Sequence, residues 1–248
     1  MKKLGLLGKN IAYSFSKAYF KKKFENEKID NITYENFDIE SIDLFPSIIK
    51  NTKNLKGINV TIPYKQDVMP YLNKVKKIAK EIGAVNTIKI TRRGKLIGYN
   101  TDYYGFTKAL EPLLKSHHMS ALILGTGGAS KAVAYSLKKL DISYHYVSRK
   151  KSEGVSYTYE TLTSSIVKQH KIIINCTPLG TFPDISHCPN IPYDGITSHH
   201  ILFDLIYNPE ETTFLKLGKQ NGAETTNGLN MLKLQAEKSW SIWKVGKK

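Results

Sequence analysis

The sequence predicts an α/β protein with two α/β domains. Short apolar runs typical of strands alternate with amphipathic segments typical of helices from end to end. Such alternation is typical of mostly parallel sheets whose faces are covered by helices. A polar break at residues 116–120 divides the pattern into two series, and the 248-residue chain is long enough for two ordinary domains.

The first series is expected to begin with a strand at Lys3–Gly8. A basic and then apolar start is faintly like a secretory signal, but its apolar part is short, is broken by glycine and lacks a small-residue cleavage site. The elements expected next are a helix over about Lys17–Glu27, a strand at 32–39, a helix at 41–50, a strand within 57–66, a helix that Pro63 can start, a hairpin of 85–90 with 96–100, and a helix from Asp102 to about Leu114.

The stretch 57–66, GINVTIPYKQ, has an unusual polar face. Its apolar positions alternate and predict a buried face formed by Ile58, Val60, Ile62 and Tyr64. The other positions carry uncharged hydrogen-bonding groups, a proline and then one lysine, Lys65. A face made only for water would more often carry charges along its length.

The second series follows the polar break with the same alternation. The expected elements are strands at 121–125, 143–148, 171–178 and 201–209, and helices at 129–140, 211–222 and 229–244. No internal repeat or low-complexity segment interrupts them.

The charge balance is strongly basic, with 37 Lys and Arg against 21 Asp and Glu, or 37 − 21 = +16. Nucleic acid is one class of partner for such a chain, but the lysines occur in nearly every segment, which favours a solvated surface. No apolar run is long enough for a membrane helix, and two cysteines cannot form a disulfide framework. We therefore expect a soluble cytoplasmic protein that binds neither nucleic acid nor membrane. No metal site is expected, and His117, His118, His199 and His200 are interpreted as surface residues.

Residues 121–137, ALILGTGGASKAVAYSL, read as a strand, a glycine-rich turn and a helix. Gly125 allows the tight turn, Gly127 lets the backbone approach a pyrophosphate, and the helix N-terminus after Gly128 favours its negative charge. Ser130 replaces the third glycine of the usual fingerprint and is still small enough for close packing. The motif predicts a dinucleotide site.

The end of the next strand indicates which dinucleotide is bound. A fold that prefers NAD places an acidic residue there for the ribose hydroxyls, whereas this chain has Ser148, Arg149, Lys150 and Lys151, with no acid before Glu153. A hydroxyl and a guanidinium suit a 2′-phosphate. The sequence therefore predicts NADP(H).

Eight motifs in order resemble those of the shikimate dehydrogenase family, over nearly the whole chain. Those that are similar to the family's substrate-domain motifs are SFS at 14–16, NVTIPYK at 59–65, GAVNT at 83–87 and GYNTDYYG at 98–105. Those that are similar to its cofactor-domain and C-terminal motifs are GTGGASKAV at 125–133, SRK at 148–150, NCTPLG at 175–180 and NGLNMLKLQA at 227–236.

The resemblance implies a particular architecture and reaction. Residues 1–102 with 229–248 would form the N-terminal substrate-binding domain, to which the C-terminal helix returns, and residues 103–228 a Rossmann-like NADP-binding domain. The implied reaction is the reversible NADPH-dependent reduction of 3-dehydroshikimate to shikimate, on the route to chorismate and the aromatic amino acids. The protein would be a monomer or a homodimer.

The resemblance also implies the site residues. Lys65 and Asp102 would be the catalytic pair. The residues implied for the substrate are Ser14 and Ser16, with Tyr207, at its carboxylate, and Asn59, Thr61, Asn86 and Gln235 near its hydroxyls and reacting carbon. Those implied for the cofactor are Gly125, Thr126, Gly127, Gly128, Ala129, Ser130, Ser148, Arg149, Lys150, Leu205 and Gly228.

Some positions depart from the family pattern without removing a group that the reaction needs. The departures are Tyr13 and Lys17 around the two serines, Ser148 and Lys150 around the arginine, and Leu205 where the family often has Met. A paralogue that acts on quinate, or that uses NAD, is the alternative. A non-catalytic nucleotide- or nucleic-acid-binding module is less favoured, because the Lys65 and Asp102 pair is intact.

The residues alone leave several roles open. Ser14 or Ser16 would also serve as the N-cap of the following helix, and Asp102 could merely cap the helix after it. Lys65 could stabilise the oxyanion and donate its proton, or it could chiefly bind and polarise the substrate. Gln235 is expected to face inward on an otherwise apolar helix pattern, but its assignment to the substrate rests mostly on the resemblance.

Overall fold

The computed structural model describes residues 1–12 and 14–243, so Tyr13 and residues 244–248 lie outside the described residues. The α/β fold class is confirmed, and the chain forms two compact units. Unit 1 comprises Met1–Asp102 and Gln235–Lys248, and unit 2 comprises Tyr103–Leu234. The division after Leu234 falls within the last helix, whereas the sequence placed the domain boundary before that helix begins.

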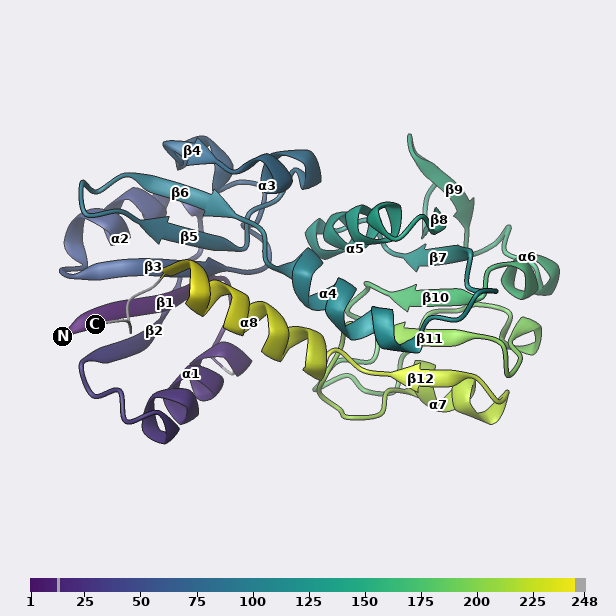
Figure 1. Cartoon of the computed structure of the whole chain (residues 1–248). Helices are drawn as coiled ribbons and strands as arrows, with labels where there is room; N and C mark the ends of the chain where they lie inside the picture. The colour runs from purple at the N-terminus through teal and green to yellow at the C-terminus, as the bar shows by residue number, and fades with distance from the viewer. Residues whose placement is uncertain (13, 244–248) are drawn as a thin grey trace. The chain divides into compact units, whose positions relative to one another are not determined.

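Unit 1 is built on a six-stranded mixed sheet with the order β2-β1-β3-β5-β6-β4 (Figure 1). Its strands are β1 (Lys2–Gly8), β2 (Ile32–Asp38), β3 (Leu55–Val60), β4 (Lys74–Val75), β5 (Thr87–Ile90) and β6 (Leu96–Tyr99). Its helices are α1 (Phe15–Asn26), α2 (Phe45–Asn51), α3 (Lys77–Ile82) and the 3-10 turns η1 (Ile42–Leu44) and η2 (Met69–Tyr71). The strands β1, β2 and β3 are parallel, while β5 runs antiparallel to both β3 and β6.

The stretch after β3 corrects two expectations. The strand ends at Val60, so the alternation does not continue: Tyr64 is buried, but Ile62 is 71% exposed. Residues 62–68 form turns rather than a helix that starts at Pro63. One i to i−4 bond forms, from Val68 N to Tyr64 O, but the next N–H, of Met69, donates to the Gln66 carbonyl instead, and Pro70 has no N–H to donate.

The C-terminal half of helix α8 (Leu229–Trp243) packs on the sheet of unit 1. Trp243 is 3% exposed, and its Nε1 donates to the Ile88 carbonyl at 2.9 Å. Lys89 Nζ donates to the Ile242 carbonyl at 2.8 Å and so binds the end of the helix. A Cβ added to Gly57 would lie 2.1 Å from the Trp243 Nε1, so only glycine leaves room for the indole on β3.

Unit 2 has the doubly wound topology of a dinucleotide-binding fold. Its six strands are all parallel and have the order β12-β11-β10-β7-β8-β9 (Figure 1). From β7 the chain adds β8 and β9 on one side and then β10, β11 and β12 on the other, so the strand order switches between β7 and β10. The strands are β7 (Ser120–Leu124), β8 (Ser143–Ser148), β9 (Val155–Thr158), β10 (Ile172–Asn175), β11 (Ile201–Asp204) and β12 (Glu224–Thr226). The helices are α4 (Asp102–Leu110), whose first residue belongs to unit 1, α5 (Gly128–Lys139), α6 (Ser164–Gln169), α7 (Thr213–Gln220), η3 (Glu111–Leu113) and η4 (Tyr193–Gly195).

Two of the four histidines expected at the surface are buried. His118 and His200 are 3% and 1% exposed, while His117 and His199 are exposed. In each buried ring, Nδ1 accepts from the backbone N–H three residues earlier, at 2.8 and 3.0 Å, and Nε2 lies 3.2 and 3.1 Å from a backbone carbonyl. Burial lowers the pKa of both rings, which favours their neutral form. Their hydrogen bonds hold loops of unit 2 in place.

Two further observations concern membrane-spanning helices and the state of the cysteines. Within residues 1–12 and 14–243, no helix combines the length and the apolar character that crossing a bilayer requires. Cys176 and Cys188 are both free thiols.

Replacement of Gly57 tests how α8 packs on β3. We expect Gly57→Ala to lower the free energy of unfolding by ~1–3 kcal/mol, because the new methyl group would overlap the Trp243 indole. Urea denaturation followed by tryptophan fluorescence measures this. Lys56→Ala, on the opposite face of the same strand, is the control and should change stability by less than ~0.5 kcal/mol. Equal stability of Gly57→Ala and the parent would contradict the packing.

Candidate active site

Lys65 and Asp102 form an ion pair in unit 1. The Lys65 Nζ lies 2.7 Å from Asp102 Oδ2, and the two side chains are 13% and 8% exposed. Lys65 lies in the turns after β3, and Asp102 is the first residue of α4, where the helix dipole favours a carboxylate. An ammonium shielded from water and held by a carboxylate can stabilise developing negative charge and transfer a proton.

Asn86 binds the other oxygen of Asp102. Its Nδ2 donates to Asp102 Oδ1 at 2.8 Å, and its Oδ1 accepts from the backbone N–H of Thr101 at 2.6 Å. A backbone N–H can only donate, so the second contact identifies the amide oxygen and directs the NH₂ group to the carboxylate. Asn86, 3% exposed, therefore orients Asp102 towards Lys65.

Gln235 reaches the same group from α8. Its Oε1 lies 3.4 Å from Asn86 Nδ2 and 3.3 Å from Thr101 Oγ1, and the residue is 6% exposed. The inward position of this glutamine is thus confirmed. Within the described residues no hydrogen bond is recorded for its Nε2, which leaves that group available to a ligand.

Asn59 is engaged at both ends inside unit 1. Its Oδ1 accepts from the Tyr34 hydroxyl at 2.8 Å. Its Nδ2 lies 3.2 Å from the Asn86 carbonyl, 3.1 Å from Thr87 Oγ1 and 3.0 Å from Ser239 Oγ. At 4% exposure, this side chain holds its neighbours in place, and its geometry favours that role over the direct ligand contact expected from the sequence.

The two serines of the SFS motif lie at the N-terminus of α1. Ser14 is the N-cap, and its Oγ accepts from Lys17 N at 3.2 Å. Ser16 is 9% exposed and lies in the first turn of α1. Capping does not exclude anion binding, because the N–H groups of the same helix terminus favour negative charge.

The remaining predicted substrate residues lie in different units. Thr61 directly follows β3 and is half-buried in unit 1, whereas Tyr207 is half-buried in unit 2. Contacts within unit 1 join a single group of predicted residues, namely Asn59, Lys65, Asn86, Asp102 and Gln235.

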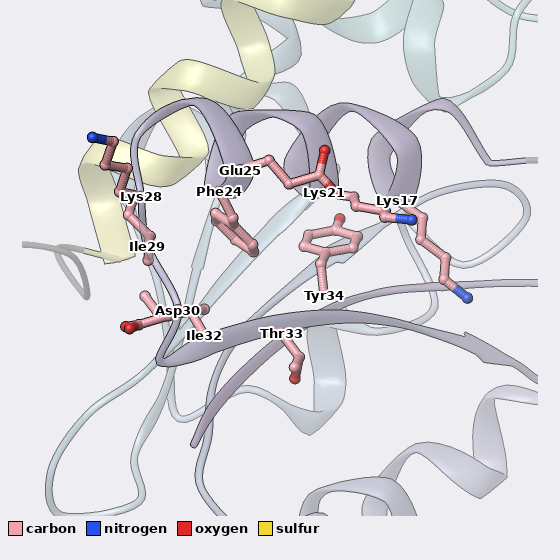
Figure 2. Close-up of a pocket in the computed structure, with 10 residues that line it drawn as sticks. All are labelled: Lys17, Lys21, Phe24, Glu25, Lys28, Ile29, Asp30, Ile32, Thr33 and Tyr34. Atoms are coloured by element: carbon pink, nitrogen blue, oxygen red, sulfur yellow. The ribbon is translucent and has the colours of Figure 1, made fainter.

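A hollow of about 520 Å³ in unit 1 lies elsewhere, between α1 and the edge strand β2 (Figure 2). Apolar side chains of Phe24, Ile32 and Tyr34 line it, together with Lys17 and Lys21 of α1. Of the described residues that line it, none is a predicted site residue. We therefore assign the chemistry to the Lys65 and Asp102 group, where charged side chains are buried and paired, rather than to this groove.

In unit 2, the glycine-rich turn has the backbone geometry of a phosphate site. Gly125 has φ +98°, a region that favours glycine, and its N–H donates to the Val147 carbonyl at 2.9 Å. Gly127 is the N-cap of α5, and no side chain of the described residues caps this helix. Ser130 is fully buried, and its Oγ donates to the Gly127 carbonyl at 2.7 Å, which tightens the turn.

This turn fits an NADP pyrophosphate. The first N–H groups of a helix have no partner within it, and among the described residues nothing lies within 4 Å of the position a Cβ would take on Gly127. Thr126 and Gly127 are exposed, and Gly128 and Ala129 begin the helix. A dinucleotide phosphate therefore has both free donors and room to approach them.

The end of β8 supplies the positive charge. Ser148 is the last residue of the strand and is half-buried, and Arg149 and Lys150 follow it on the exposed surface. These three side chains offer a hydroxyl, a guanidinium and an ammonium at the strand end next to the glycine-rich turn. The donor set fits the 2′-phosphate of NADP(H).

Leu205 and Gly228 adjoin one another in unit 2. The Gly228 N–H donates to the Ile206 carbonyl at 2.9 Å, and a Cβ on Gly228 would lie 2.1 Å from the Leu205 carbonyl oxygen. The loop that carries Leu205 is held by Asp204, whose Oδ1 accepts from Ile206 N at 3.0 Å and whose Oδ2 accepts from the Thr212 hydroxyl at 2.6 Å. Glycine at 228 is thus required by the close approach of this loop.

Sequence reasoning missed four buried hydroxyls of unit 1. These are Tyr34, Thr87, Thr101 and Ser239, each of which bonds a predicted site residue. Thr87 and Thr101 stand beside Asn86 and Asp102 in the same motifs. Ser239 lies four residues after Gln235, on the same face of the helix, and that spacing was the available signal.

Comparison with known proteins places the chain among dehydrogenases. A family profile described as "Shikimate dehydrogenase substrate binding domain" matches residues 6–88. A protein of Clostridium beijerinckii named shikimate dehydrogenase (NADP(+)) is 41% identical, over 96% of this chain and 90% of its own length.

Solved structures are similar over the whole chain. The shikimate 5-dehydrogenase of Thermus thermophilus, in complex with NADP(H) and shikimate, is 28% identical, with a TM-score of 0.87 over 98% of this chain and 94% of that one. The quinate dehydrogenase of Corynebacterium glutamicum, in complex with NAD, is 25% identical, with a TM-score of 0.85 over 98% of this chain and 93% of that one.

Asp204 gives the stability of unit 2 a pH dependence. Burial raises the pKa of this carboxyl to about 6, so the native state holds the proton more tightly than the unfolded chain does. The free energy of unfolding should therefore fall as the pH rises from about 4 to about 6, by up to ~3 kcal/mol from this group. Asp204→Asn can keep the bonds that Oδ1 accepts from Ile206 N and from Asn175 Nδ2, both at 3.0 Å, and can donate to Thr212, so it should remove most of this decline.

Urea denaturation at pH 4, 5, 6 and 7 measures the effect. Asp30→Asn, at an exposed position, is the matched control and should keep the parent's decline. A decline in Asp204→Asn as steep as that of the parent would rule out this origin.

Proposed function

The chain belongs to the shikimate dehydrogenase family, and we propose that it catalyses the reversible NADPH-dependent reduction of 3-dehydroshikimate to shikimate. The Lys65 and Asp102 pair carries the proposal: an ammonium lies 2.7 Å from a buried carboxylate, in the unit that contains the substrate-binding-domain match. In this proposal unit 1 binds the substrate and unit 2 binds the cofactor. The reaction would serve the route to chorismate and the aromatic amino acids.

Lys65 stabilises the negative charge that develops on the substrate oxygen during the reaction. Reduction of the ketone leaves an alkoxide, which the Lys65 ammonium stabilises and protonates. Asp102 holds the ammonium at the reacting carbonyl, and Asn86 holds Asp102. In the reverse direction Lys65, as the neutral amine, accepts the proton of the substrate hydroxyl and returns to the ammonium. An ammonium has three donors, and Asp102 is its one recorded partner in the described part of the chain, so donors remain for the substrate.

The other polar groups of unit 1 bind and orient the substrate. Ser14 and Ser16 hold its carboxylate, helped by the N-terminus of α1, while Thr61 and the Nε2 of Gln235 meet its hydroxyls. Tyr207 of unit 2 assists at the carboxylate. Neutral donors suit a polyhydroxy ring, because additional fixed charges would have to be desolvated.

The cofactor residues of unit 2 hold NADP(H). The proposed contacts are the turn from Gly125 to Ser130 for the pyrophosphate, Ser148, Arg149 and Lys150 for the 2′-phosphate, and Leu205 and Gly228 near the nicotinamide. When bound, NADPH supplies the hydride.

A preference for quinate or NAD is the alternative, since a quinate dehydrogenase with NAD bound has the same fold. The run Ser148–Arg149–Lys150, with no acid before Glu153, favours NADP. The test follows the absorbance of the reduced cofactor with shikimate or quinate and with NADP⁺ or NAD⁺. Fastest turnover with shikimate and NADP⁺ supports the proposal, and fastest turnover with quinate or NAD⁺ supports the alternative.

The partners in this proposal are small molecules, and the chain acts in the cytoplasm as a monomer or a homodimer. We assign no role to nucleic acid, membrane or metal. If the chain bound nucleic acids of many sequences with an affinity that fell steeply as the salt concentration rose, the charge of +16 would also serve nucleic-acid binding.

Replacement of Lys65 separates proton transfer from binding. We expect Lys65→Ala to lower kcat by roughly 10²–10⁴-fold, the range for loss of a general acid or base, with a smaller change in KM for shikimate. Lys74→Ala, at an exposed position of unit 1, is the control and should keep the parent's kcat. A raised KM with kcat preserved would assign Lys65 a binding role instead.

Replacement of Arg149 tests the choice of cofactor. Arg149→Ala should raise KM for NADP⁺ by about 10- to 100-fold, since hydrogen bonds to charged groups contribute ~1.5–3 kcal/mol. KM for NAD⁺, which lacks the 2′-phosphate, should change little. Lys151→Ala is the matched control, because Lys151 Nζ donates to the Ser156 carbonyl at 2.9 Å. Equal losses for both cofactors would place Arg149 away from the 2′-phosphate.

A further inference from the structure

Three buried hydroxyls meet at one point inside unit 1. The Ser239 Oγ lies 2.8 Å from Thr87 Oγ1 and 3.0 Å from Thr101 Oγ1, and the two threonine oxygens are 3.2 Å apart. All three residues are fully buried. They come from α8, from β5 and from the segment after β6, so the hydroxyls join the C-terminal helix to the segments that carry Asn86 and Asp102.

The hydrogen bonds around this cluster have a defined direction. One atom of the Asn59 side-chain amide lies 3.2 Å from the Asn86 carbonyl oxygen. Because a carbonyl oxygen can only accept a hydrogen bond, that atom is the donor Nδ2. The same NH₂ group lies 3.0 Å from Ser239 Oγ, which accepts from it. On the other side, the Thr101 N–H identifies the Asn86 oxygen. Two amides are thus held in one orientation each, with Ser239 and Thr101 between them.

We propose that Ser239 is a positioning residue for the Lys65 and Asp102 pair, acting through Thr101 and Asn86. The inference deepens the proposed function and rests on it. The path runs from Ser239 to the Thr101 hydroxyl at 3.0 Å, from Thr101 N to Asn86 Oδ1 at 2.6 Å, and from Asn86 Nδ2 to Asp102 Oδ1 at 2.8 Å. Asp102 then holds Lys65 at 2.7 Å.

Ser239 also connects to Tyr34. The Asn59 amide that donates to Ser239 accepts from the Tyr34 hydroxyl at 2.8 Å. One serine of α8 therefore lies on hydrogen-bonded paths to the buried Tyr34 hydroxyl and to the Lys65 and Asp102 pair.

An ordinary helical serine does not account for these contacts. Serines inside helices commonly donate to a carbonyl of the preceding turn, and Ser239 does so to Gln235 O at 2.9 Å. Ser241 makes the same kind of bond to Lys238 O at 2.7 Å, but it is exposed. Ser239 differs by its three further side-chain partners on other elements, and Ser241 is its matched control on the same helix.

The first test compares Ser239→Ala with Ser241→Ala. Ser239→Ala should lower kcat for shikimate oxidation by roughly tenfold, because small displacements of catalytic groups are costly. KM for shikimate should change by less than about threefold, and KM for NADP⁺, which unit 2 binds, should stay at the parent value. Ser241→Ala should match the parent in all three constants.

Thr101 supplies a second pair of variants, which decides the matter if Ser239→Ala does not fold. Thr101→Val removes the hydroxyl at equal size and should lower kcat, whereas Thr101→Ser keeps the hydroxyl and should retain most of it. The double variant Ser239→Ala with Thr101→Val should be about as active as the poorer single variant, because both changes break one path.

Three results would overturn the inference. They are a folded Ser239→Ala with kcat within twofold of the parent, a loss confined to the KM for shikimate, and a Thr101→Val that is as active as Thr101→Ser. A parent enzyme with no activity on shikimate would instead overturn the proposed function, so the two failures are distinguishable.

Discussion

The buried carboxylate of Asp102 is the constraint on which the organisation of unit 1 depends. A charge removed from water is strongly destabilising unless each of its lone pairs finds a partner. Lys65 satisfies one oxygen and Asn86 the other. Each partner then has to be held in turn, which explains why a group of amides and hydroxyls lies among the strands where apolar side chains would otherwise pack. The return of α8 to this unit supplies Gln235 and Ser239 to the same group.

The organisation of unit 2 depends on a different constraint, namely that backbone N–H groups must be exposed where a phosphate can approach them. Its central strands β7, β10 and β11 are mostly apolar and buried, and the proposed cofactor residues lie in the loops at the carboxyl ends of the strands. The turn at residue 125 has a positive φ, which glycine adopts readily. The close approach of Leu205 leaves no room for a side chain at residue 228. The exception is Asp204, a buried acid that holds the loop after β11. Backbone geometry thus dominates in unit 2, whereas side-chain networks dominate in unit 1.

Sequence reasoning succeeded where a local signal determines the structure. The glycine-rich turn between β7 and α5 follows from residue type and spacing, as does the inward face of Gln235. It failed where tertiary contacts decide. Ile62 continues the alternation of β3 but is exposed, because the strand has already ended. His118 and His200 are polar yet buried, because a backbone N–H three residues earlier satisfies each Nδ1 and a carbonyl distant in the sequence satisfies each Nε2. The hydroxyl of Ser239 gains its partners only once α8 has packed on β3 and β5.

The most direct test of this account is a double-mutant cycle between Lys65 and Asp102, with kcat for shikimate oxidation as the measured quantity. If the two side chains act as one unit, Lys65→Ala, Asp102→Ala and the double variant should show similar losses, because the first change already removes the working pair. Losses that multiply in the double variant would show that the two residues act independently, and would contradict the account.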